Sequence, residues 1–575
     1  MIGLVLGINP CVAGLNFHDP SVCLMNSEKI IYAMEEERLN RIRHSSGMFP
    51  SLAVEECKKI AQNLNIPITD IAIGFDPELC YHRQTFSISS KTHIDERVRM
   101  TLLLKKETGL LNARVSFYPH HQAHAASAVS LIESKHAMCV VFDGTGELSA
   151  ASIWETKNGQ LNLIDSIDMP NSLGYFYAAA TAYVGFNPWG EEGKLMALAP
   201  YGKSDEAIMR QMALFFDTDE QYKYDVSSII APCLYSGYSL NIEQVIKQFE
   251  HIFSYPRRNP DSPLLPWHKN FAYCVQHCVE QSVFSYINKW QKELKPVHIC
   301  CAGGLFMNCK MNGFLRQKFT NLDFVVQPVA GDAGTAIGAA ILCTQDKKNE
   351  KISIELNELS LGTNYTDKYV EDALQSKGIK YYKSRNISLD CAQLIHQGKI
   401  VAWFQGRNEL GCRALGHRSI LAAPFPRYMS NIINQRVKHR EIWRPFACSL
   451  LEDFADDVLV GYKKNIRPAY MIEAYPVYCK WHTRMEAVMH VADKTTRPQV
   501  VRSDEPNNLY YEMIKYYYKL SGSPMVLNTS LNDKGQPIIQ SPEDAVQFFL
   551  THDIDYLIIH QFVVSKDGNN REFNY

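Results

Sequence analysis

The chain has 575 residues, of which 46% are hydrophobic and 21% charged, enough for two or more folded domains. Its 59 basic and 61 acidic residues give a formal net charge of −2 without a polybasic block, which argues against a large nucleic-acid-binding surface. No apolar run reaches the roughly 18–20 residues of a membrane span. The sixteen cysteines form no C-x-x-C pair and indicate buried free thiols. We therefore expect a cytoplasmic protein without a nucleic-acid or membrane partner.

The first half of the chain repeats one plan of strands and helices. From the spacing of apolar residues we expect strands at 3–9, 21–25, 30–36 and 70–75, and helices at 50–64 and 120–134. A second series has strands at 137–143, 149–155 and 161–167. Each copy has an apolar strand, a Gly-rich turn and an antiparallel meander, and ends in helices. This duplication is typical of the actin-like/sugar-kinase (ASKHA) fold, in which two βββαβα halves clamp a nucleotide.

Further elements complete this half and begin a second α/β unit. We expect helices at 268–290 and 331–343, a buried strand at 298–301, and then the turn of Gly303 and Gly304. Glycines let the backbone approach a ligand, and the next helix N-terminus favours a phosphate. The polar run 345–351 marks the domain edge, so we assign residues 1–350 to one domain and 351–575 to another. A helix from Ser388 and a strand at 400–404 open the second.

His120 and His124 are the most informative pair of side chains. If their segment is helical, both imidazoles lie on one face, one turn apart, and can hold a metal. The Glu that follows the first His in zinc hydrolases is replaced by His121, so other ligands are needed. Asp143 and Asp332 stand in Gly-rich turns and complete a mixed nitrogen and oxygen set, which suits Fe, Mn or Zn. The alternative is a helix start with surface histidines.

The second domain combines basic residues with tight glycine turns. A site that binds several phosphate groups needs arginines, which form paired hydrogen bonds, and a lysine as a point charge. The alternative is that each arginine is a surface or ion-paired residue. Taken together, the basic and amide groups favour an anion site, and they are Arg413, His417, Arg418, Lys438, Arg440, Arg444, Arg497 and Asn528.

The ordered motifs resemble the O-carbamoyltransferases of the nodulation, cephamycin and nebramycin-synthase type. The resemblance covers residues 3–564. The matching motifs are Phe17–Ser21, Glu35–His44, His120–Ala128, Asp143–Glu147, Ser172–Gly174, Lys194–Ala199, Ala302–Gly304, Gly331–Gly334, Arg413–Ser419, Arg444–Ala447 and Asn528–Asn532.

The resemblance implies two half-reactions in two domains. The C-terminal, YrdC-like domain would convert carbamoyl phosphate and ATP with Mg into carbamoyl-adenylate. The N-terminal domain, similar to the tRNA threonylcarbamoyl-transfer ATPases (TsaD-like), would pass the carbamoyl group to a small-molecule alcohol and release AMP. Carbamate is a poor electrophile because its nitrogen donates into the carbonyl, and a mixed anhydride with AMP supplies a leaving group.

The resemblance also implies roles for single residues. The metal would be Fe(II) or another divalent ion, and His18 would be the general base for the acceptor hydroxyl. The implied metal ligands are His120, His124, Asp143 and Asp332. The implied adenosine-side residues are Gly303, Gly304 and Asn308. The implied carbamoyl phosphate and ATP residues are Arg413, Lys438, Arg444, Arg497, Asn528 and Ser530.

Three positions depart from the family pattern. The family commonly has Pro at the positions of Cys412 and Cys448, and Lys at the position of Arg43. Arg43 lies where an acceptor-side cation is expected, so this exchange bears on acceptor choice. We expect the two cysteines to loosen the backbone beside the anion site.

Two other functions compete with this interpretation. One is a tRNA-modifying threonylcarbamoyl transferase, which the near-neutral charge and the C-terminal motifs argue against. The other is a non-catalytic nucleotide-binding protein, which the full set of histidines and cations argues against. The sequence does not name the acceptor, because the segments 76–118 and 232–268 carry no readable signal, and it is silent on oligomeric state.

Overall fold

The computed structural model describes residues 3–11, 18–80, 95–133, 136–157, 159–216, 224–235, 239–348, 358–464, 470–503 and 508–566. The chain forms two compact units. Unit 1 comprises Met1–Glu36 and Ser45–Leu356, and unit 2 comprises Glu37–His44 and Asn357–Tyr575. The sequence interpretation placed all of 1–350 in one domain, whereas the structure groups Glu37–His44 with the second unit. Among the described residues, no helix has both the length and the apolar character needed to cross a membrane.

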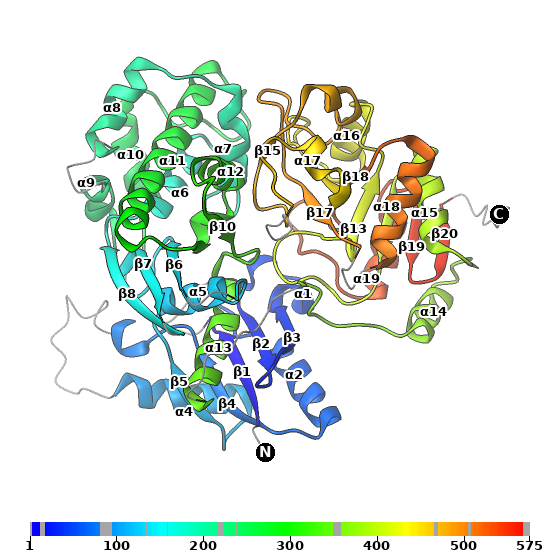
Figure 1. Cartoon of the computed structure of the whole chain (residues 1–575), viewed down its shortest axis with the longest axis horizontal. Helices are drawn as coiled ribbons and strands as arrows, with labels where there is room; N and C mark the ends of the chain where they lie inside the picture. Colours follow the sequence, from blue (N-terminus) through cyan, green and yellow to red (C-terminus); the bar gives the residue numbers. More distant parts are fainter. Residues whose placement is uncertain are drawn as a thin grey trace. The chain divides into compact units, whose positions relative to one another are not determined.

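Unit 1 contains two five-stranded sheets of the same strand order (Figure 1). In each sheet the first three strands in the sequence are antiparallel and the last two are added in parallel. The duplication that the sequence predicts is therefore confirmed. The first sheet has the order β3-β2-β1-β4-β5 and comprises β1 (Leu4–Asn9), β2 (Ser21–Met25), β3 (Ile30–Glu35), β4 (Ile68–Ile73) and β5 (Arg114–Phe117). The second has the order β10-β9-β6-β7-β8 and comprises β6 (His136–Phe142), β7 (Ser149–Lys157), β8 (Gln160–Asp168), β9 (His298–Ala302) and β10 (Asp323–Val326).

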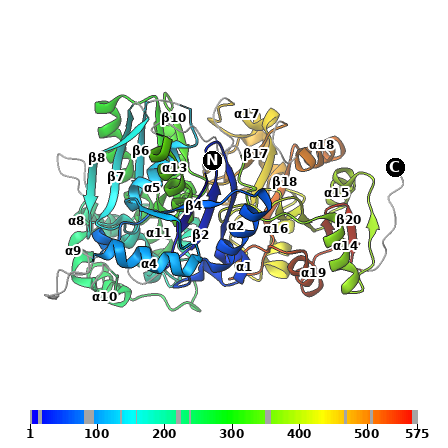
Figure 2. The ribbon, with the colours of Figure 1, turned by 90° about the horizontal axis from the view of Figure 1, so that it is seen from below.

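Two small-residue helices lie between these sheets (Figures 1 and 2). Helix α5 (His120–Val129) packs on β6, β7 and β9, and α13 (Thr335–Lys348) packs on β1, β2 and β4. The helices contact each other closely: a Cβ built on Gly338 would lie 1.8 Å from the carbonyl oxygen of Ala123. Glycine and alanine are needed at such a crossing because any larger side chain would separate the backbones.

Gly338→Ala should therefore lower the free energy of unfolding by about 3 kcal/mol, because neither helix backbone can give way easily. Gly193→Ala in helix α7 (Glu192–Leu198) is the matched control. Nothing lies within 4 Å of its added Cβ, so this change should be neutral or stabilise by up to about 1 kcal/mol. Urea unfolding measures both. Equal midpoints for the two variants would contradict the close packing.

Of the remaining described helices of unit 1, α4 and α6 to α10 were not among the expected elements. Helices α4 and α10 lie in the segments 76–118 and 232–268, which carried no readable signal. The expected helix at 120–134 ends earlier, at Val129. The helices are α2 (Ser51–Leu64), α4 (Glu96–Thr108), α6 (Leu173–Tyr183), α7, α8 (Glu206–Phe216), α9 (Ser227–Ile230), α10 (Ile242–Phe253), α11 (Pro266–Leu294) and α12 (Cys309–Lys318).

Unit 2 is built on a mixed eight-stranded sheet, in which β12–β19 and β14–β17 are the parallel pairs. Its order is β11-β20-β19-β12-β13-β18-β14-β17, and a two-stranded sheet of β15 (Tyr475–Pro476) and β16 (Thr495–Thr496) accompanies it. The strands are β11 (Tyr382–Lys383), β12 (Val401–Phe404), β13 (Arg418–Ala422), β14 (Ala447–Leu451), β17 (Gln499–Val501), β18 (Met525–Ser530), β19 (Tyr556–Ile559) and β20 (Phe562–Ser565).

Helices cover both faces of this sheet. Because side chains alternate along a strand, Ala402 and Phe404 of β12 join one hydrophobic core and Val401 and Trp403 join the other. Helices α14 (Asp367–Ser376), α16 (Tyr428–Ile432), α17 (Ala455–Val458) and α19 (Pro542–Thr551) contribute to the first core, and α15 (Ile387–His396) and α18 (Asn508–Ser521) to the second. Unit 2 is thus a three-layer α/β structure.

The segment Glu37–His44 is held in unit 2 by its arginines. It includes most of α1 (Glu36–Asn40). Arg38 is buried and donates to the carbonyl oxygen of Gly411 at 2.5 Å. Arg41 donates to the carbonyl oxygens of Ile538 at 2.6 Å and Pro537 at 3.0 Å. Arg43, the expected acceptor-side cation, lies in this segment and therefore belongs to unit 2.

All sixteen cysteines are free thiols, as expected. Fourteen are buried, but Cys412 and Cys479 are exposed, so the prediction of burial is wrong for these two.

Candidate metal centre and anion site

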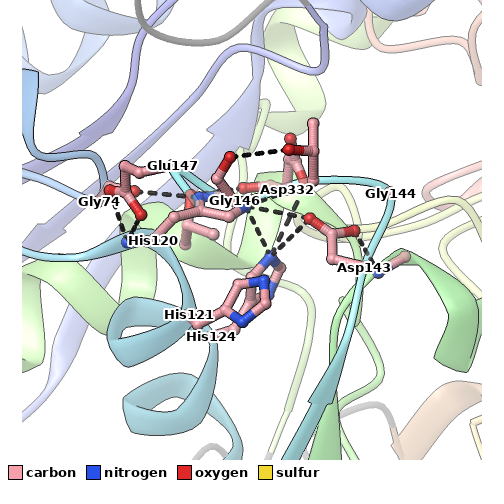
Figure 3. A network of polar contacts seen from close by, with 12 residues as sticks. Gly74, His120, His121, His124, Asp143, Gly144, Gly146, Glu147 and Asp332 are labelled. Atoms are coloured by element: carbon pink, nitrogen blue, oxygen red, sulfur yellow. Dashed lines mark hydrogen bonds and ion pairs between the residues drawn. The ribbon is translucent and has the colours of Figure 1, made fainter. Parts of the chain in front are cut away.

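Four ligand groups converge in unit 1 (Figure 3). His120 and His124 lie on α5, Asp143 directly follows β6, and Asp332 begins the short 3-10 helix Asp332–Gly334. One atom from each lies within 4.8 Å of all the others. The Nε2 atoms of the two histidines are 3.1 Å apart, and Nε2 of His120 lies 3.2 Å from Oδ2 of Asp143. The four residues that the sequence analysis grouped therefore lie together in the structure.

All four residues are buried, and both histidines are fully inaccessible. The alternative of surface histidines at a helix start is therefore wrong. Asp332 Oδ1 lies 3.6 Å from Nε2 of each histidine. Two imidazoles and two carboxylates thus converge on one place. Together they provide the nitrogen and oxygen ligands that a divalent cation binds.

The groups around this set orient its ligands. The carbonyl oxygen of Gly74 can only accept, so Nδ1 of His120, at 3.0 Å, must donate to it and leaves Nε2 as the ligand atom. Phe75 stacks on the His120 ring at 4.0 Å. The backbone N–H of Gly304 donates to Oδ1 of Asp143 at 2.8 Å and leaves Oδ2 facing the histidines. The ligand atoms of His120 and Asp143 are thus oriented before any ion binds.

Glu147 is a buried residue that the sequence placed only in a motif. Its carboxylate accepts from the backbone N–H of His120 at 2.9 Å and of Asp76 at 2.8 Å, and so caps the start of α5 (Figure 3). Burial raises the pKa of Glu147, while His120 and these N–H groups oppose the rise. Glu147 stands four residues after the ligand Asp143 in the same motif, and this position could have indicated a role at the site.

In this group the charges of neighbouring side chains outweigh the effect of burial on the pKa values. Burial would lower the pKa of His120, but Asp332 and Asp143 raise it to about 10. Burial would likewise raise the pKa of Asp332, whereas His18 and His120 lower it well below its usual range. A metal must therefore displace a proton from His120, so its affinity should increase with pH.

His18 stands beside this group. Its Nε2 lies 3.9 Å from Oδ2 of Asp332, and its Nδ1 lies 2.9 Å from Oδ2 of Asp19. Burial opposes protonation, but Asp332 and Asp19 raise the pKa of His18 to about 10. A base role for His18 therefore requires another cation to offset the charge of Asp332. The side chain is 47% exposed, so an acceptor can reach it.

The expected adenosine-side residues have clear structural roles. Gly303 has φ +98°, and its Cβ would lie 2.2 Å from the carbonyl oxygen of Phe142, so only glycine fits there. Asn308 is buried, caps α12 through the N–H of Met311 and exchanges hydrogen bonds with Gln276. Gly304 contacts the metal group through Asp143, and the adenosine role of all three stays a prediction.

In unit 2 the basic residues gather around β18. Nζ of Lys438 donates to the carbonyl oxygens of Ser530 and Asn532, both at 2.8 Å, and to Oδ1 of Asn532 at 2.7 Å. Asn528 and Ser530 are two residues apart on β18, so their side chains share one face. Asn528 donates to Oγ of Ser449 at 2.9 Å and to the carbonyl oxygen of Ala414 at 3.1 Å.

The positive charges of this cluster lower one another's pKa values. Burial lowers the pKa of Lys438 well below its usual value, and Arg440 and Arg444 lower it further. Burial also lowers the pKa of Arg440, as do Arg444 and Arg497. Arg440 is one of the basic residues that the sequence analysis assigned to the anion site, although the family resemblance did not give it a role in binding carbamoyl phosphate or ATP. A bound anion would offset this concentration of positive charge, so the cluster is suited to anion binding.

Several buried polar atoms of unit 2 have no hydrogen-bond partner among the described residues. Oδ1 of Asn528 and Nε of Arg413 are two of them. An acceptor and a donor held in this way suit a ligand that carries both an N–H group and an anionic oxygen. Arg418, by contrast, is buried against Phe404 and donates to the backbone of Gln405, so it has a structural role.

Comparison with known proteins identifies the family to which the chain belongs. The model "Carbamoyltransferase N-terminus" matches residues 83–341, and "Carbamoyltransferase C-terminus" matches residues 392–566. Nodulation protein NolNO of Sinorhizobium fredii is 31% identical over 96% of this chain and 79% of its own length. The chain belongs to the carbamoyltransferase family. Uncharacterized protein sll1178 of Synechocystis is a further relative of this carbamoyltransferase, 30% identical over 96% of the chain and 95% of its own length.

Solved structures resemble the carbamoyltransferase more distantly. The phosphate- and nucleotide-bound form of full-length HypF has a TM-score of 0.35 and 12% identity, covering 61% of this chain and 56% of that one. A ROK hexokinase from Thermus thermophilus has a TM-score of 0.30 and 11% identity, covering 60% of this chain and 99% of that one.

Two cysteines depart from the expected pattern near the carbamoyltransferase's cationic cluster. Cys448 is buried on β14 opposite Leu527, with Sγ 3.6 Å from Oγ1 of Thr496, whereas Cys412 is exposed. Burial raises the pKa of Cys448 to about 12, so it is a neutral thiol. That these residues loosen the backbone stays a prediction.

Anion binding at Lys438 should take up protons. The lysine pKa is lowered in the free protein, and an anion favours the ammonium form, so binding should weaken as pH rises from the lowered value towards the ordinary value of about 10.4. Sulfate is a suitable probe because its own charge is constant in this range. Calorimetry in buffers of different ionisation enthalpy should show uptake, and a heat that is independent of the buffer would contradict this assignment.

Proposed function

We propose that this carbamoyltransferase is an ATP-dependent O-carbamoyltransferase that acts in two half-reactions. Unit 2, with a YrdC-like role in residues 351–575, would use water to release phosphate from carbamoyl phosphate, and the resulting carbamate would attack the α-phosphate of ATP with Mg to give carbamoyl-adenylate and pyrophosphate. Unit 1, with a TsaD-like role in residues 1–350 and an actin-like fold, would transfer the carbamoyl group to a hydroxyl and release AMP. The observation that carries this proposal is the convergence of His120, His124, Asp143 and Asp332 beside His18.

The residues of unit 1 fit a divalent cation. Their mixed donors suit Fe, Mn or Zn, and the family resemblance favours Fe(II). Bound there, such an ion supplies Lewis acidity towards a carbonyl and a charge partner for a phosphate. The chain itself orients His120 through Gly74 and Glu147, and Asp143 through Gly304, so these two ligands need little reorganisation when the adenylate binds.

His18 is the proposed base for the acceptor. It lies on the exposed side of the ligand group, next to Asp332, where an alcohol can approach. Asp19, at 2.9 Å from Nδ1, orients the ring and leaves Nε2 for the hydroxyl proton. Arg43 remains a candidate for contact with the acceptor.

The cations of unit 2 are the proposed site for phosphate groups. Lys438, Arg444 and Arg497 would offset the charges of carbamoyl phosphate and ATP, and Ser530 lies beside Lys438. The unpartnered Oδ1 of Asn528 suits the NH₂ group of a carbamoyl substituent, and Nε of Arg413 suits an anionic oxygen. Arg440 adds a further positive charge.

His18→Asn tests the division between the two half-reactions. The variant should release pyrophosphate from ATP and carbamoyl phosphate at the normal rate, while transfer to an alcohol falls by about 10²–10⁴-fold. Both products are measured in one reaction by mass spectrometry, over a panel of small-molecule alcohols. His251→Asn, which changes an exposed histidine of α10, is the control. An equal loss of pyrophosphate release would contradict the assignment of His18 to transfer.

A further inference from the structure

A second group of metal-ligand side chains lies in unit 2, next to Lys438 and Arg440 in the chain. It comprises His439, Asp533 and His552, with one ligand atom of each within 4.8 Å of the others. Nδ1 of His439 lies 3.2 Å from Oδ1 of Asp533, and Nε2 of His552 lies 3.4 Å from Oδ2 of the same carboxylate. Three separate segments supply these residues: the chain after the π-helix Ile433–Val437, the loop after β18 and the end of α19.

His552 is already oriented as a ligand. Its Nδ1 lies 3.0 Å from the carbonyl oxygen of Phe548, which can only accept, so Nδ1 carries the proton and Nε2 is left with its lone pair towards Asp533. The ring stacks on Phe548 at 3.9 Å and is only 11% exposed. A backbone acceptor on one ring nitrogen is the usual arrangement around a metal-binding histidine.

His439 is placed by an unusual backbone conformation. Its φ is +42°, in the left-handed region, where His, Asn and Asp are the commonest residues after Gly. This conformation turns the chain between Lys438, which is buried, and Arg440, and it sets the His439 ring against Asp533.

We propose that His439, Asp533 and His552 form a second transition-metal site, of the zinc class, that is independent of the group in unit 1. Ligands about 2.0–2.1 Å from a tetrahedral Zn²⁺ lie about 3.3–3.5 Å apart, close to the observed spacings around Asp533. Two imidazoles favour Zn²⁺ over Mg²⁺ or Ca²⁺, which prefer oxygen ligands. Because His439 is 53% exposed, water can take the fourth position.

Such an ion would join the two segments that hold Lys438. His439 follows Lys438 in the chain, and Asp533 follows Asn532, whose carbonyl and side-chain oxygens both accept from Nζ of Lys438. Zinc binding should therefore slow amide hydrogen exchange in residues 438–440 and 531–534. This effect does not depend on ATP, carbamoyl phosphate or turnover.

Zinc stoichiometry in the full-length, metal-stripped protein tests the site. Competition with a chromophoric chelator is measured for the wild type, His439→Asn, His124→Ala and the double variant. The wild type should bind two equivalents, each single variant one and the double variant none. Asparagine tolerates the left-handed φ, so His439→Asn should fold normally. His396→Asn, at an exposed histidine of α15, should bind as the wild type does.

The outcomes separate this site from the proposed function. If His439→Asn binds as much zinc as the wild type and shows the same slowing of exchange, the second site is wrong. If His439→Asn loses one equivalent but His124→Ala loses none, the second site stands and the metal centre of unit 1 fails. Asp533→Asn provides an independent check, because it removes the shared carboxylate and should also lose one equivalent.

Discussion

His124→Ala should remove the metal from unit 1 and lower carbamoyl transfer by about 10³-fold. His124 is fully buried, and its Nε2 lies 3.1 Å from Nε2 of His120 and 3.6 Å from Oδ1 of Asp332. Alanine leaves three ligands and two buried carboxylates whose charges are less well compensated. Elemental analysis of the purified protein, together with the rate of transfer from supplied carbamoyl-adenylate, measures both effects.

The same variant should keep the first half-reaction, because the cations of unit 2 are unchanged. Pyrophosphate release from ATP and carbamoyl phosphate should therefore stay within about twofold of the wild type, a difference of less than about 0.5 kcal/mol in activation free energy. His251→Ala, at an exposed position of α10, is the control for loss of a histidine. A His124→Ala protein with full metal content and full transfer would show that the four residues are a structural polar cluster.

Arg444→Ala should stop the first half-reaction and spare the second. The charge of Arg444 acts on both Lys438 and Arg440, so it belongs to the cationic cluster. Loss of one positioned cation at a site of developing phosphate charge costs about 10²–10³-fold in rate. Pyrophosphate release should fall by that factor, while supplied carbamoyl-adenylate should still be used.

The matched control for Arg444→Ala is Arg436→Ala. Arg436 lies in the preceding π-helix, is 61% exposed and pairs at 3.5 Å with the exposed Asp553, so its loss should change the rate little. If Arg444→Ala fails with the supplied intermediate as well, the assignment of the two half-reactions to two sites is wrong.

The metal group could be predicted because its signals are local. His120 and His124 have helical spacing, and Asp143 and Asp332 stand at strand and turn ends that the apolar pattern marks. The duplication of the two sheets was visible for the same reason, since each copy repeats an apolar strand and a meander.

Residues whose roles depend on distant contacts could not be predicted. Glu147 caps α5 from 27 positions away, and nothing near it in the sequence indicates that contact. The segment Glu37–His44 joins unit 2 through Arg38 and Gly411, which are 373 positions apart. Burial of His120 and His124 also depends on the sheets around α5, so the sequence left a surface alternative open.

Two missed helices did carry local signals. Asp95 caps the start of α4 by accepting from the N–H groups of Arg97 and Val98, and Gly109, with φ +71°, caps its end. Asn241 caps the start of α10 by accepting from the N–H of Gln244. Closer attention to these capping residues would have revealed both helices, although not their packing.

Formation of carbamoyl-adenylate is the most direct test of the proposed chemistry. The metal-replete protein is incubated with ATP, Mg²⁺ and carbamoyl phosphate but no acceptor alcohol, and the nucleotides are identified by mass spectrometry. We predict carbamoyl-adenylate and pyrophosphate in equal amounts, in the wild type and His18→Asn alike, with neither from Arg444→Ala. Conversion of ATP to ADP, or no nucleotide product at all, would contradict a two-step carbamoyl transfer by this chain.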